Sequence, residues 1–326
     1  MDLIALFKER SRAAGTRVIL PEGNDERIVA AARIIAAEGW AKPILVDAVA
    51  PASVPAGVLH FSTADAARMA HYTEVYRRAS PDLPEKVAQR VVKKALVFGG
   101  CAVAAGDADC MVAGAANTTA SVISAASIAI GLTPGIKSPS SFFLMAFPDL
   151  MGQGPQVLVY ADCAVNIQPT VEQLADIAIT TANSAKVLLG VDPKIAMLSF
   201  STKGSGQHAD ADKVIAALKI VRERRPDLAI DGELQADSAI VPRVAAKKCP
   251  ESPVAGKANV LIFPDLDAGN IGYKLSQYLG KARAYGPILQ GFKRPCSDLS
   301  RGATAEDIVG TAAIVAAAAS GSEPRP

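Results

Sequence analysis

The sequence predicts an α/β fold with two lobes, in which mostly parallel sheets are covered by helices. Short, β-branched apolar runs alternate along the chain with stretches rich in Ala, Lys and Glu, as in parallel strands joined by helices. The apolar runs are continuous, which is typical of strands buried on both faces. The length of 326 residues corresponds to two domains at about 150 residues each.

The first elements follow directly from local pattern. Residues 1–10 are too acidic, and their apolar run is too short, for a signal peptide. We expect them to form a first amphipathic helix. Arg17–Leu20 is a strand that ends in the turn Pro21–Asn24, and a helix follows from Asp25 to about Gly39. The apolar positions of this helix fall on one face: Ile28, Ala31, Ala32 and Ile35.

Seven further apolar runs are predicted to be strands: Pro43–Val46, Cys110–Ala113, Phe142–Met145, Val157–Tyr160, Ile195–Leu198, Leu228–Ile230 and Val260–Phe263. Ligands of parallel sheets bind beyond the carboxyl ends of the strands. The functional candidates are therefore the turns after the strands, which contain Pro-Glu-Gly, Gly-Ala-Ala-Asn, Ser-Thr-Lys-Gly, Asp-Gly-Glu and Pro-Asp.

One long segment lacks charge, from Cys110 to Ile136. It contains Asn117, Pro134 and several Ser, Thr and Gly residues, which disfavour a membrane span. We therefore expect a buried helix with polar turns.

Charge and cysteine usage narrow the class of protein. The 34 Lys and Arg residues against 32 Asp and Glu residues leave a net charge of +2, which argues against nucleic acid or an anionic membrane as partner. Five scattered cysteines without a C-x-x-C pair favour free thiols in a reducing cytoplasm over disulfides or a zinc site. No metal is expected.

Two polar segments favour anions. Ser199–Gly206 follows a strand and precedes a helix, so its small residues can turn N–H groups toward an anion, with Lys203 adding a charge. The segment also matches a G-x-G-x-x-A dinucleotide pattern loosely, and an ordinary strand-to-helix turn is the alternative.

The second segment is Asp298–Asp307. Thr304 is a helix N-cap with Asp307 as its reciprocal acid, which by itself accounts for Asp307. Ser300 and Arg301 precede this helix, where a hydroxyl and a guanidinium favour an anion or an oxyanion. A surface salt bridge is the alternative for Arg301.

Two other clusters have simpler explanations. Asp231, Glu233 and Asp237 follow a strand, and we interpret them as a turn with a helix cap rather than a metal or acid–base site, with Asp231-Gly232 as the turn pair. Arg77 and Arg78 form either a solvated helix face or a polyphosphate contact.

Six longer runs share a resemblance. Residues 195–206, 230–237, 252–265, 269–274, 284–291 and 298–302 resemble the phosphate acetyltransferase (phosphotransacetylase) family, that is, the phosphate acetyl/butyryltransferases. The resemblance extends over nearly the whole chain and is strongest from about residue 193 to 310.

The resemblance implies an isocitrate/isopropylmalate dehydrogenase-like fold. Domain I would comprise residues 1–136 and 288–326, and domain II residues 137–287, with the active site in the cleft between them. The implied reaction is acetyl-CoA + phosphate ⇌ acetyl phosphate + CoA, without metal or tightly bound cofactor, in a homodimer.

The resemblance also implies roles for individual residues. Ser300 would donate a hydrogen bond to the developing oxyanion, Arg301 would hold the phosphoryl oxygens, and Asp307 would accept the thiol proton. Arg77 would contact the phosphates of CoA. The acyl-phosphate pocket would use Asn117, Thr118, Thr119, Ser201, Thr202, Lys203, Gly204 and Ser205.

The chain departs from the family at Ser124, where relatives often carry an arginine, so one anion contact is missing or comes from elsewhere. Three alternatives remain open at this stage. They are a phosphate butyryltransferase-type enzyme for longer acyl chains, a non-catalytic acyl-CoA-sensing module, and a nicotinamide dehydrogenase supported only by the loose glycine pattern.

Overall fold

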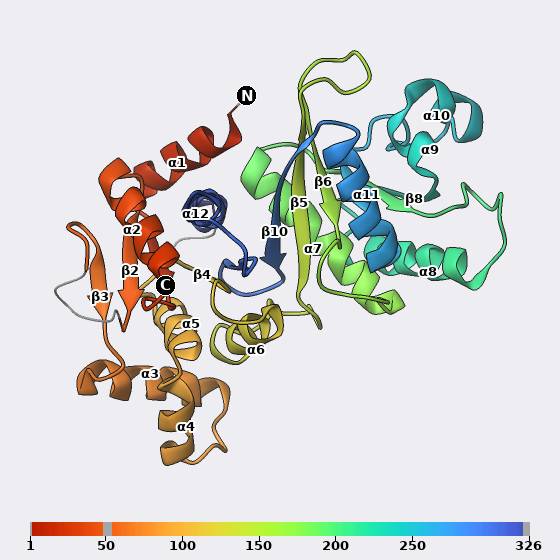
Figure 1. The fold of residues 1–326 in the computed structure, drawn as a ribbon. Coiled ribbons are helices and arrows are strands. Elements are labelled where there is room, and N and C mark those ends of the chain that lie inside the picture. The colour runs from red at the N-terminus through yellow and green to blue at the C-terminus, as the bar shows by residue number, and fades with distance from the viewer. Residues whose placement is uncertain (1, 48–53, 322–326) are drawn as a thin grey trace. The chain divides into compact units, whose positions relative to one another are not determined.

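The structure is a computed structural model that describes residues 2–47 and 54–321 (Figure 1). It divides into two compact units. Unit 1 comprises Met1–Pro134 and Phe292–Pro326, and unit 2 comprises Gly135–Gly291. Each unit has its own sheet with its own helices.

Unit 1 is built on a five-stranded sheet in the order β11-β4-β1-β2-β3. All four strand pairs are parallel. The strands are β1 (Arg17–Leu20), β2 (Lys42–Val46), β3 (Leu59–Phe61), β4 (Cys110–Ala113) and β11 (Cys296–Asp298). The carboxyl ends of all five strands therefore meet at one edge of this sheet.

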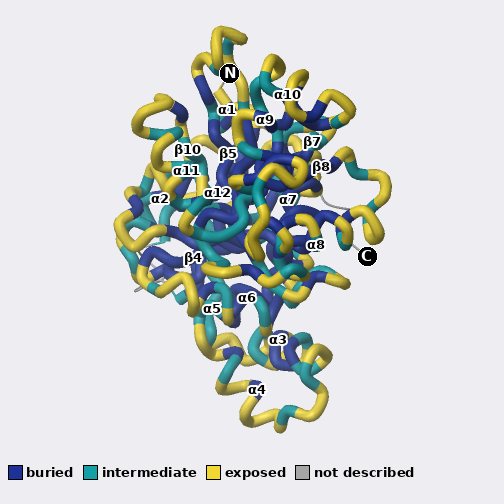
Figure 2. Tube along the Cα trace, turned by 90° about the vertical axis from the view of Figure 1, so that its right-hand side faces the viewer, coloured by how far each residue is buried: buried dark blue, intermediate teal, exposed yellow. Residues whose placement is uncertain are grey.

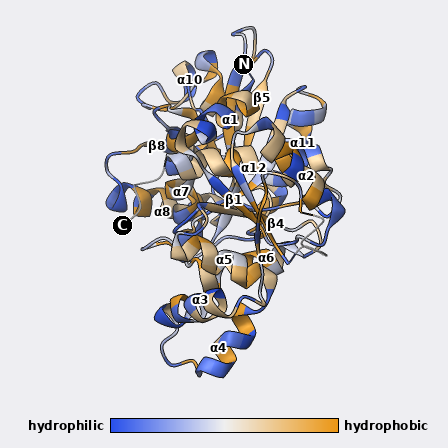
Figure 3. Ribbon diagram, turned by 90° about the vertical axis from the view of Figure 1, so that its left-hand side faces the viewer, coloured by the Kyte–Doolittle hydropathy of each residue, from blue (hydrophilic) through white to orange (hydrophobic). Residues whose placement is uncertain are grey.

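Seven helices in the described part of unit 1 accompany this sheet: α1 (Leu3–Ala14), α2 (Glu26–Glu38), α3 (Ala66–Ala79), α4 (Glu85–Val92), α5 (Ala95–Ala105), α6 (Thr119–Ala129) and α12 (Ala305–Ser320). α12 packs against α1, α2 and β4. α5 and α12 are hydrophobic over most of their length (Figure 3), as is typical of buried helices. Trp40, Tyr72 and Phe98 are fully buried in this unit.

Unit 2 has a six-stranded sheet in the order β10-β5-β6-β9-β7-β8. β6, β9, β7 and β8 run parallel, whereas β5 is antiparallel to both of its neighbours. The strands are β5 (Ser140–Phe147), β6 (Gln156–Ala161), β7 (Lys194–Leu198), β8 (Ala229–Leu234), β9 (Val260–Ile262) and β10 (Arg283–Gln290).

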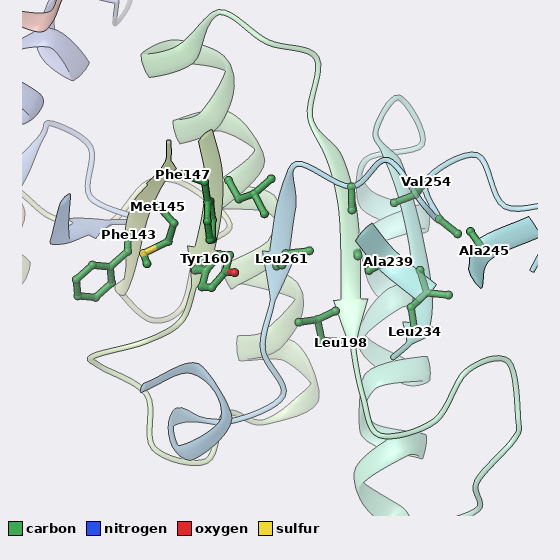
Figure 4. Packing of buried hydrophobic residues seen from close by; sticks show 14 of the residues in the cluster. Phe143, Met145, Phe147, Tyr160, Leu198, Leu234, Ala239, Ala245, Val254 and Leu261 are labelled. Carbon is green, nitrogen blue, oxygen red and sulfur yellow. The ribbon is translucent and has the colours of Figure 1, made fainter. Parts of the chain in front are cut away.

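The helices of unit 2 are α7 (Val171–Leu189), α8 (Ala209–Arg224), α9 (Ala236–Ile240), α10 (Pro242–Lys248) and α11 (Leu266–Tyr278). One apolar cluster joins the sheet to α9 and α10, with Met145, Tyr160, Leu198, Leu234 and Leu261 among its members (Figure 4). β5 is mostly buried, whereas α4 and α10 are mostly exposed (Figure 2).

The predicted α/β class with mostly parallel sheets is confirmed. The helix expected from Asp25 to about Gly39 is α2, which begins after the N-cap Asp25 and ends before Gly39 at φ 65°, the left-handed conformation that favours glycine after a helix. The uncharged segment after Cys110 forms β4 and the partly buried α6. Within the described residues, no helix is long and apolar enough to cross a bilayer.

Two local predictions need correction. Asp231-Gly232 is not a turn, because β8 continues through Asp231, Gly232 and Glu233 to Leu234. The two acids are therefore buried in the edge strand of the sheet. β3, β10 and β11 were not predicted from the sequence; β3 and β11 are only three residues long, too short for a clear apolar pattern.

Candidate functional site

Three neighbouring strands of unit 1 end where the sequence predicts functional turns. β11, β4 and β1 are adjacent and parallel. Their carboxyl ends lead into the Ser300 loop (residues 299–304), the Gly114 turn (residues 114–119) and the turn that contains Glu22. The sheet therefore gathers segments that are distant in sequence, as expected for a parallel sheet.

Glu22 organises the Gly114 turn. Its carboxylate is buried and accepts backbone N–H groups of Gly114, Ala115 and Ala116 at 2.8, 2.9 and 2.9 Å. It also accepts the side-chain amide of Asn117 at 2.7 Å. One carboxylate thus satisfies four donors, which orients the predicted substrate residue Asn117.

Arg27, on the first turn of α2, connects two of these segments. Its guanidinium donates to the carbonyls of Arg301 and Ala303 at 2.7 and 3.2 Å. It also donates to the carbonyl of Ala115 at 2.7 Å. A forked pair with Asp25 fixes the guanidinium, and that hydrogen bond lowers the pKa of Asp25.

Asp298 lies at the end of β11 and is 5% exposed. Thr119 Oγ1 donates to its Oδ2 at 2.5 Å, while Oδ1 is buried without a hydrogen-bond partner in the described part of the chain. Burial raises the pKa of Asp298 to about 6, and the charge of Glu22 adds to the rise, against the hydrogen bond from Thr119. Oδ1 fills the space where a side chain at Gly114 would stand.

Ser300 and Arg301 are both exposed at the surface of unit 1. The Ser300 hydroxyl accepts the N–H of Gly302 at 3.2 Å, and the N–H of Ala303 bonds to the Ser300 carbonyl at 2.9 Å. These bonds close the loop on itself. The Arg301 carbonyl faces Arg27, so the loop is held by its backbone.

Asp307 forms the predicted capping box with Thr304. Its Oδ2 accepts the N–H and the hydroxyl of Thr304 at 2.9 and 3.0 Å, and Thr304 Oγ1 accepts the N–H of Asp307 at 3.2 Å. The capping interpretation is confirmed. Asp307 is exposed, so its second role, as a base, stays a prediction.

The remaining predicted residues of unit 1 lie on two helices. Arg77 is on α3 and half-buried, and its Nε is buried without a hydrogen-bond partner among the described residues. Thr118 is the N-cap of α6 and accepts the N–H of Ser121. Ser124 is exposed on the same helix. The structure thus joins Asn117 to Glu22 and Thr119 to Asp298, and Thr118 lies between these two residues in the chain.

The predicted loop of unit 2 differs from an open anion cradle. The N–H groups of Lys203 and Gly204 bond to the backbone carbonyl and the carboxylate of Glu233 at 3.1 and 2.7 Å. The buried Ser201 hydroxyl donates to the same carboxylate at 2.8 Å. Glu233 therefore occupies donors that the sequence assigned to an anion.

The hydroxyls and the cation of this loop are also engaged. Thr202 Oγ1 accepts the N–H of Gln235 at 2.9 Å, and Ser205 Oγ accepts the N–H of Thr202 at 2.9 Å. Lys203 Nζ lies 2.5 Å from Asp231. A groove of about 600 Å³ is lined by Lys203, Gly204, Ile215, Leu218, Lys219, Arg222, Glu223, Gly232 and Glu233.

Asp231 balances the cations of this groove. Both Lys203 and Arg222 bond to its carboxylate. Burial disfavours the charged carboxylate, but hydrogen bonds led by Lys203 outweigh burial and lower the pKa of Asp231. No group of three or more His, Cys, Asp or Glu side chains in residues 2–47 and 54–321 could hold a metal ion.

Sequence reasoning did not single out Arg27. It named Asp298 only as the start of the Asp298–Asp307 segment, interpreted Glu233 as part of a turn with a helix cap, and placed Glu22 only in a candidate turn. The sequence gives a weak indication of a site at two of these carboxylates. Glu22 follows the predicted strand Arg17–Leu20, and Asp298 ends the short strand β11, so each lies at the carboxyl end of a strand. Arg27 has no such indication, because the three carbonyls that it binds are 88 to 276 residues away along the chain.

Comparison with known proteins assigns the class. A 4-hydroxythreonine-4-phosphate dehydrogenase from Klebsiella pneumoniae matches with a TM-score of 0.52 and 12% identity over 94% of this chain and 99% of its own, which indicates a shared fold alone. The family model described as "Phosphate acetyl/butaryl transferase" matches residues 2–316. The chain belongs to this family and is an acyltransferase, as the resemblance predicted.

Two relatives indicate how similar the family members are. A phosphate acetyltransferase of Acetivibrio thermocellus is 44% identical over 324 residues, which is 97% of this chain and 98% of the relative. The crystal structure of a phosphotransacetylase from Streptococcus pyogenes has a TM-score of 0.88 and 41% identity, and the match includes 97% of this chain and 98% of that one.

Proposed function

We propose that the protein transfers an acetyl group between CoA and inorganic phosphate: acetyl-CoA + phosphate ⇌ acetyl phosphate + CoA. The relatives named phosphate acetyltransferase, at 44% and 45% identity over nearly the whole chain, support this substrate pair. One structural observation carries the proposal: the Ser300 loop and the Gly114 turn follow adjacent parallel strands and are joined through Arg27.

The proposed chemistry is direct transfer. The CoA sulfur attacks the carbonyl carbon of acetyl phosphate, the C–O bond to phosphate breaks, and phosphate leaves with its electron pair. Asp307 accepts the thiol proton, which aids attack because a thiol with a pKa of about 8.5 is mostly protonated at neutral pH. Ser300 donates to the carbonyl oxygen as it becomes an oxyanion, and Arg301 binds the phosphoryl oxygens.

The other residues contact the substrates. Arg77 binds the phosphates of CoA through its guanidinium, a group that is half-buried on α3. Asn117, Thr118 and Thr119 bind the acyl phosphate. The predicted contribution of residues 201–205 to the same substrate stays a prediction, because Glu233 already accepts the hydroxyl of Ser201 and the N–H of Gly204. CoA is a substrate here, and no tightly bound cofactor takes part.

The predicted organisation belongs to the same proposal. Domain I comprises residues 1–136 and 288–326 and domain II residues 137–287, with boundaries within a few residues of the two compact units. We expect a cytoplasmic enzyme, an expectation supported by five cysteines that are all buried free thiols.

We also propose a homodimer that pairs α11 with its copy. Ile271, Leu275, Tyr278 and Leu279 are 57%, 52%, 76% and 78% exposed and, at this spacing, form one apolar stripe. Asp267 stands near the start of the helix and Lys281 just beyond its end. Antiparallel pairing of two copies brings opposite charges together at both ends, which favours a second copy as the occupant.

Arsenate-dependent hydrolysis of acetyl-CoA tests the reaction. Arsenate replaces phosphate as acyl acceptor, and the resulting acyl arsenate, a mixed anhydride, hydrolyses in water, so CoA thiol accumulates and can be titrated. We expect turnover with acetyl-CoA to exceed turnover with butyryl-CoA. Faster turnover of butyryl-CoA would favour the longer-acyl alternative, and no turnover of either would contradict the proposal. Titration of NADH fluorescence, expected to show no binding, addresses the dehydrogenase alternative.

A further inference from the structure

Two charged residues outside the proposed catalytic set bind the backbone of the segments that carry it. Glu22 binds the Gly114 turn, and Arg27 binds both that turn and the Ser300 loop. We propose that Glu22 and Arg27 are positioning residues that hold the Ser300 loop and the Gly114 turn in one fixed arrangement for acyl transfer. This inference rests on the proposed function.

The Glu22 carboxylate acts as a template for the turn. Three consecutive N–H groups, from Gly114 to Ala116, point at its two oxygens. Such N–H groups converge on an anion, and here the anion is a buried side chain from the turn that follows β1. Because Asn117 donates to the same carboxylate, the direction of its side chain is set as well.

Arg27 is suited to tie two segments because a guanidinium has several donors in a rigid plane. It reaches three carbonyls: two in the Ser300 loop, at Arg301 and Ala303, and one in the Gly114 turn, at Ala115. Asp25 holds the plane from the other side. A lysine at this position has one nitrogen and cannot reach the same set of acceptors.

The rate of acyl transfer depends on how accurately Ser300 and Arg301 are positioned. Ser300 and Arg301 are exposed, so packing does not hold their side chains, and the backbone of the loop sets their direction. A displacement of about 1 Å at a reacting group costs about 100-fold in rate. Loss of the Arg27 tie therefore lowers kcat more than it raises KM.

The test compares Arg27→Ala and Arg27→Lys with a matched control, Arg17→Lys. Arg17 also makes a forked pair with an aspartate, Asp109, and donates to a carbonyl, that of Gly106. It is the first residue of β1, so it stands at the opposite end of the strand from Glu22. Urea unfolding checks that each variant is folded.

We expect both Arg27 variants to lose about 30- to 100-fold in kcat with KM changed by less than about threefold, and the Arg17 variant to keep wild-type kcat. Glu22→Gln should resemble the Arg27 variants, because its amide N–H₂ opposes the N–H groups of the turn. Wild-type kcat in folded Arg27→Lys would overturn the inference. Equal losses in Arg17→Lys would do the same.

A second measurement does not depend on activity. Hydrogen exchange of the peptide that contains residues 299–304 reports the order of the Ser300 loop. We expect faster exchange in Arg27→Ala than in wild type and no change in Arg17→Lys. If the wild type turns over neither acetyl-CoA nor butyryl-CoA, the proposed function fails. The exchange measurement still tests whether Arg27 positions the loop, because unchanged exchange in Arg27→Ala would reject that role.

Discussion

Glu22 and Asp298 are two buried carboxyl groups at the same turn with different environments. Glu22 accepts hydrogen bonds from four donors. Asp298 accepts the hydroxyl of Thr119 at Oδ2 and interacts with the backbone of Leu299, while Oδ1 is buried without a hydrogen-bond partner among the described residues. Burying a charge without partners is costly, so burial disfavours the charged form of Asp298. Burial therefore raises the pKa of Asp298 to about 6.

This difference predicts how stability depends on pH. The pKa of Asp298 is raised from 3.8 to about 6, so between these values the folded chain keeps a proton that the unfolded chain loses. Stability is thus lost as pH rises through that window, by about 3 kcal/mol at most. We expect Asp298→Asn to be more stable than wild type at pH 7.5, with the difference shrinking at pH 4.

Urea unfolding at the two pH values measures this effect. Asp227→Asn is the control. Arg225 lowers the pKa of the exposed Asp227 carboxyl to about 2, so removing this charge should make the chain less stable than wild type at pH 7.5, the opposite of the effect expected for Asp298→Asn. A constant difference between Asp298→Asn and wild type at both pH values would show that titration of Asp298, next to Glu22, does not contribute.

Arg301 carries the second prediction at this scale. We expect Arg301→Ala to lower kcat by about 100-fold or more, as loss of one donor to a developing charge does. The free energy of unfolding should change little, because the side chain is exposed and the loop is held through its backbone. Steady-state kinetics with acetyl-CoA and phosphate measure the change in kcat. Wild-type turnover in Arg301→Ala would reject the role of Arg301 in binding the phosphoryl oxygens.

At the scale of elements, the first turn of α12 has to serve both a cap and a proposed base. Thr304 and Asp307 hold each other in the capping box, which orients the Asp307 carboxylate at the start of the helix. A cap of this kind contributes about 1 kcal/mol to stability. The two functions can be separated because only one of them needs a carboxylate.

We expect Asp307→Asn to lower kcat by about 100-fold or more, because an amide cannot accept the thiol proton, while its oxygen still accepts the N–H of Thr304. Thr304→Ala should lower the free energy of unfolding by about 1 kcal/mol and lower kcat much less than Asp307→Asn does, because the N–H of residue 304 still bonds to the Asp307 carboxylate. Kinetics and urea unfolding of both variants measure this contrast. Full activity in Asp307→Asn would leave capping as the only role of Asp307.

For the whole molecule, the exposed stripe on α11 predicts assembly. We expect the wild type to be a dimer by light scattering after gel filtration, and Leu275→Glu to dissociate it, because the substitution places a charge in the apolar stripe. Val87→Glu is the matched control, since Val87 is 42% exposed on α4 of the other unit. A monomeric wild type, or a dimer that survives Leu275→Glu, would contradict this surface.

Much of the fold could be predicted because the information is local. The apolar run of β4, the cap residues Asp25 and Gly39 of α2, and the Thr304–Asp307 box are each contained in a few neighbouring residues. Asp231 was misassigned because an Asp-Gly pair favours a turn, whereas pairing with β7 keeps it in a strand. That pairing is not local.

By itself, the sequence determined the α/β class, the positions of most strands and the turns at which chemistry was expected. The tertiary structure decided which side chains hold those turns. Glu22 meets the Gly114 turn across 92 residues and Arg27 meets Arg301 across 274. Apolar periodicity and helix caps involve residues that are close together in the sequence. The hydrogen bonds of the site instead join segments that become neighbours only when the sheet forms.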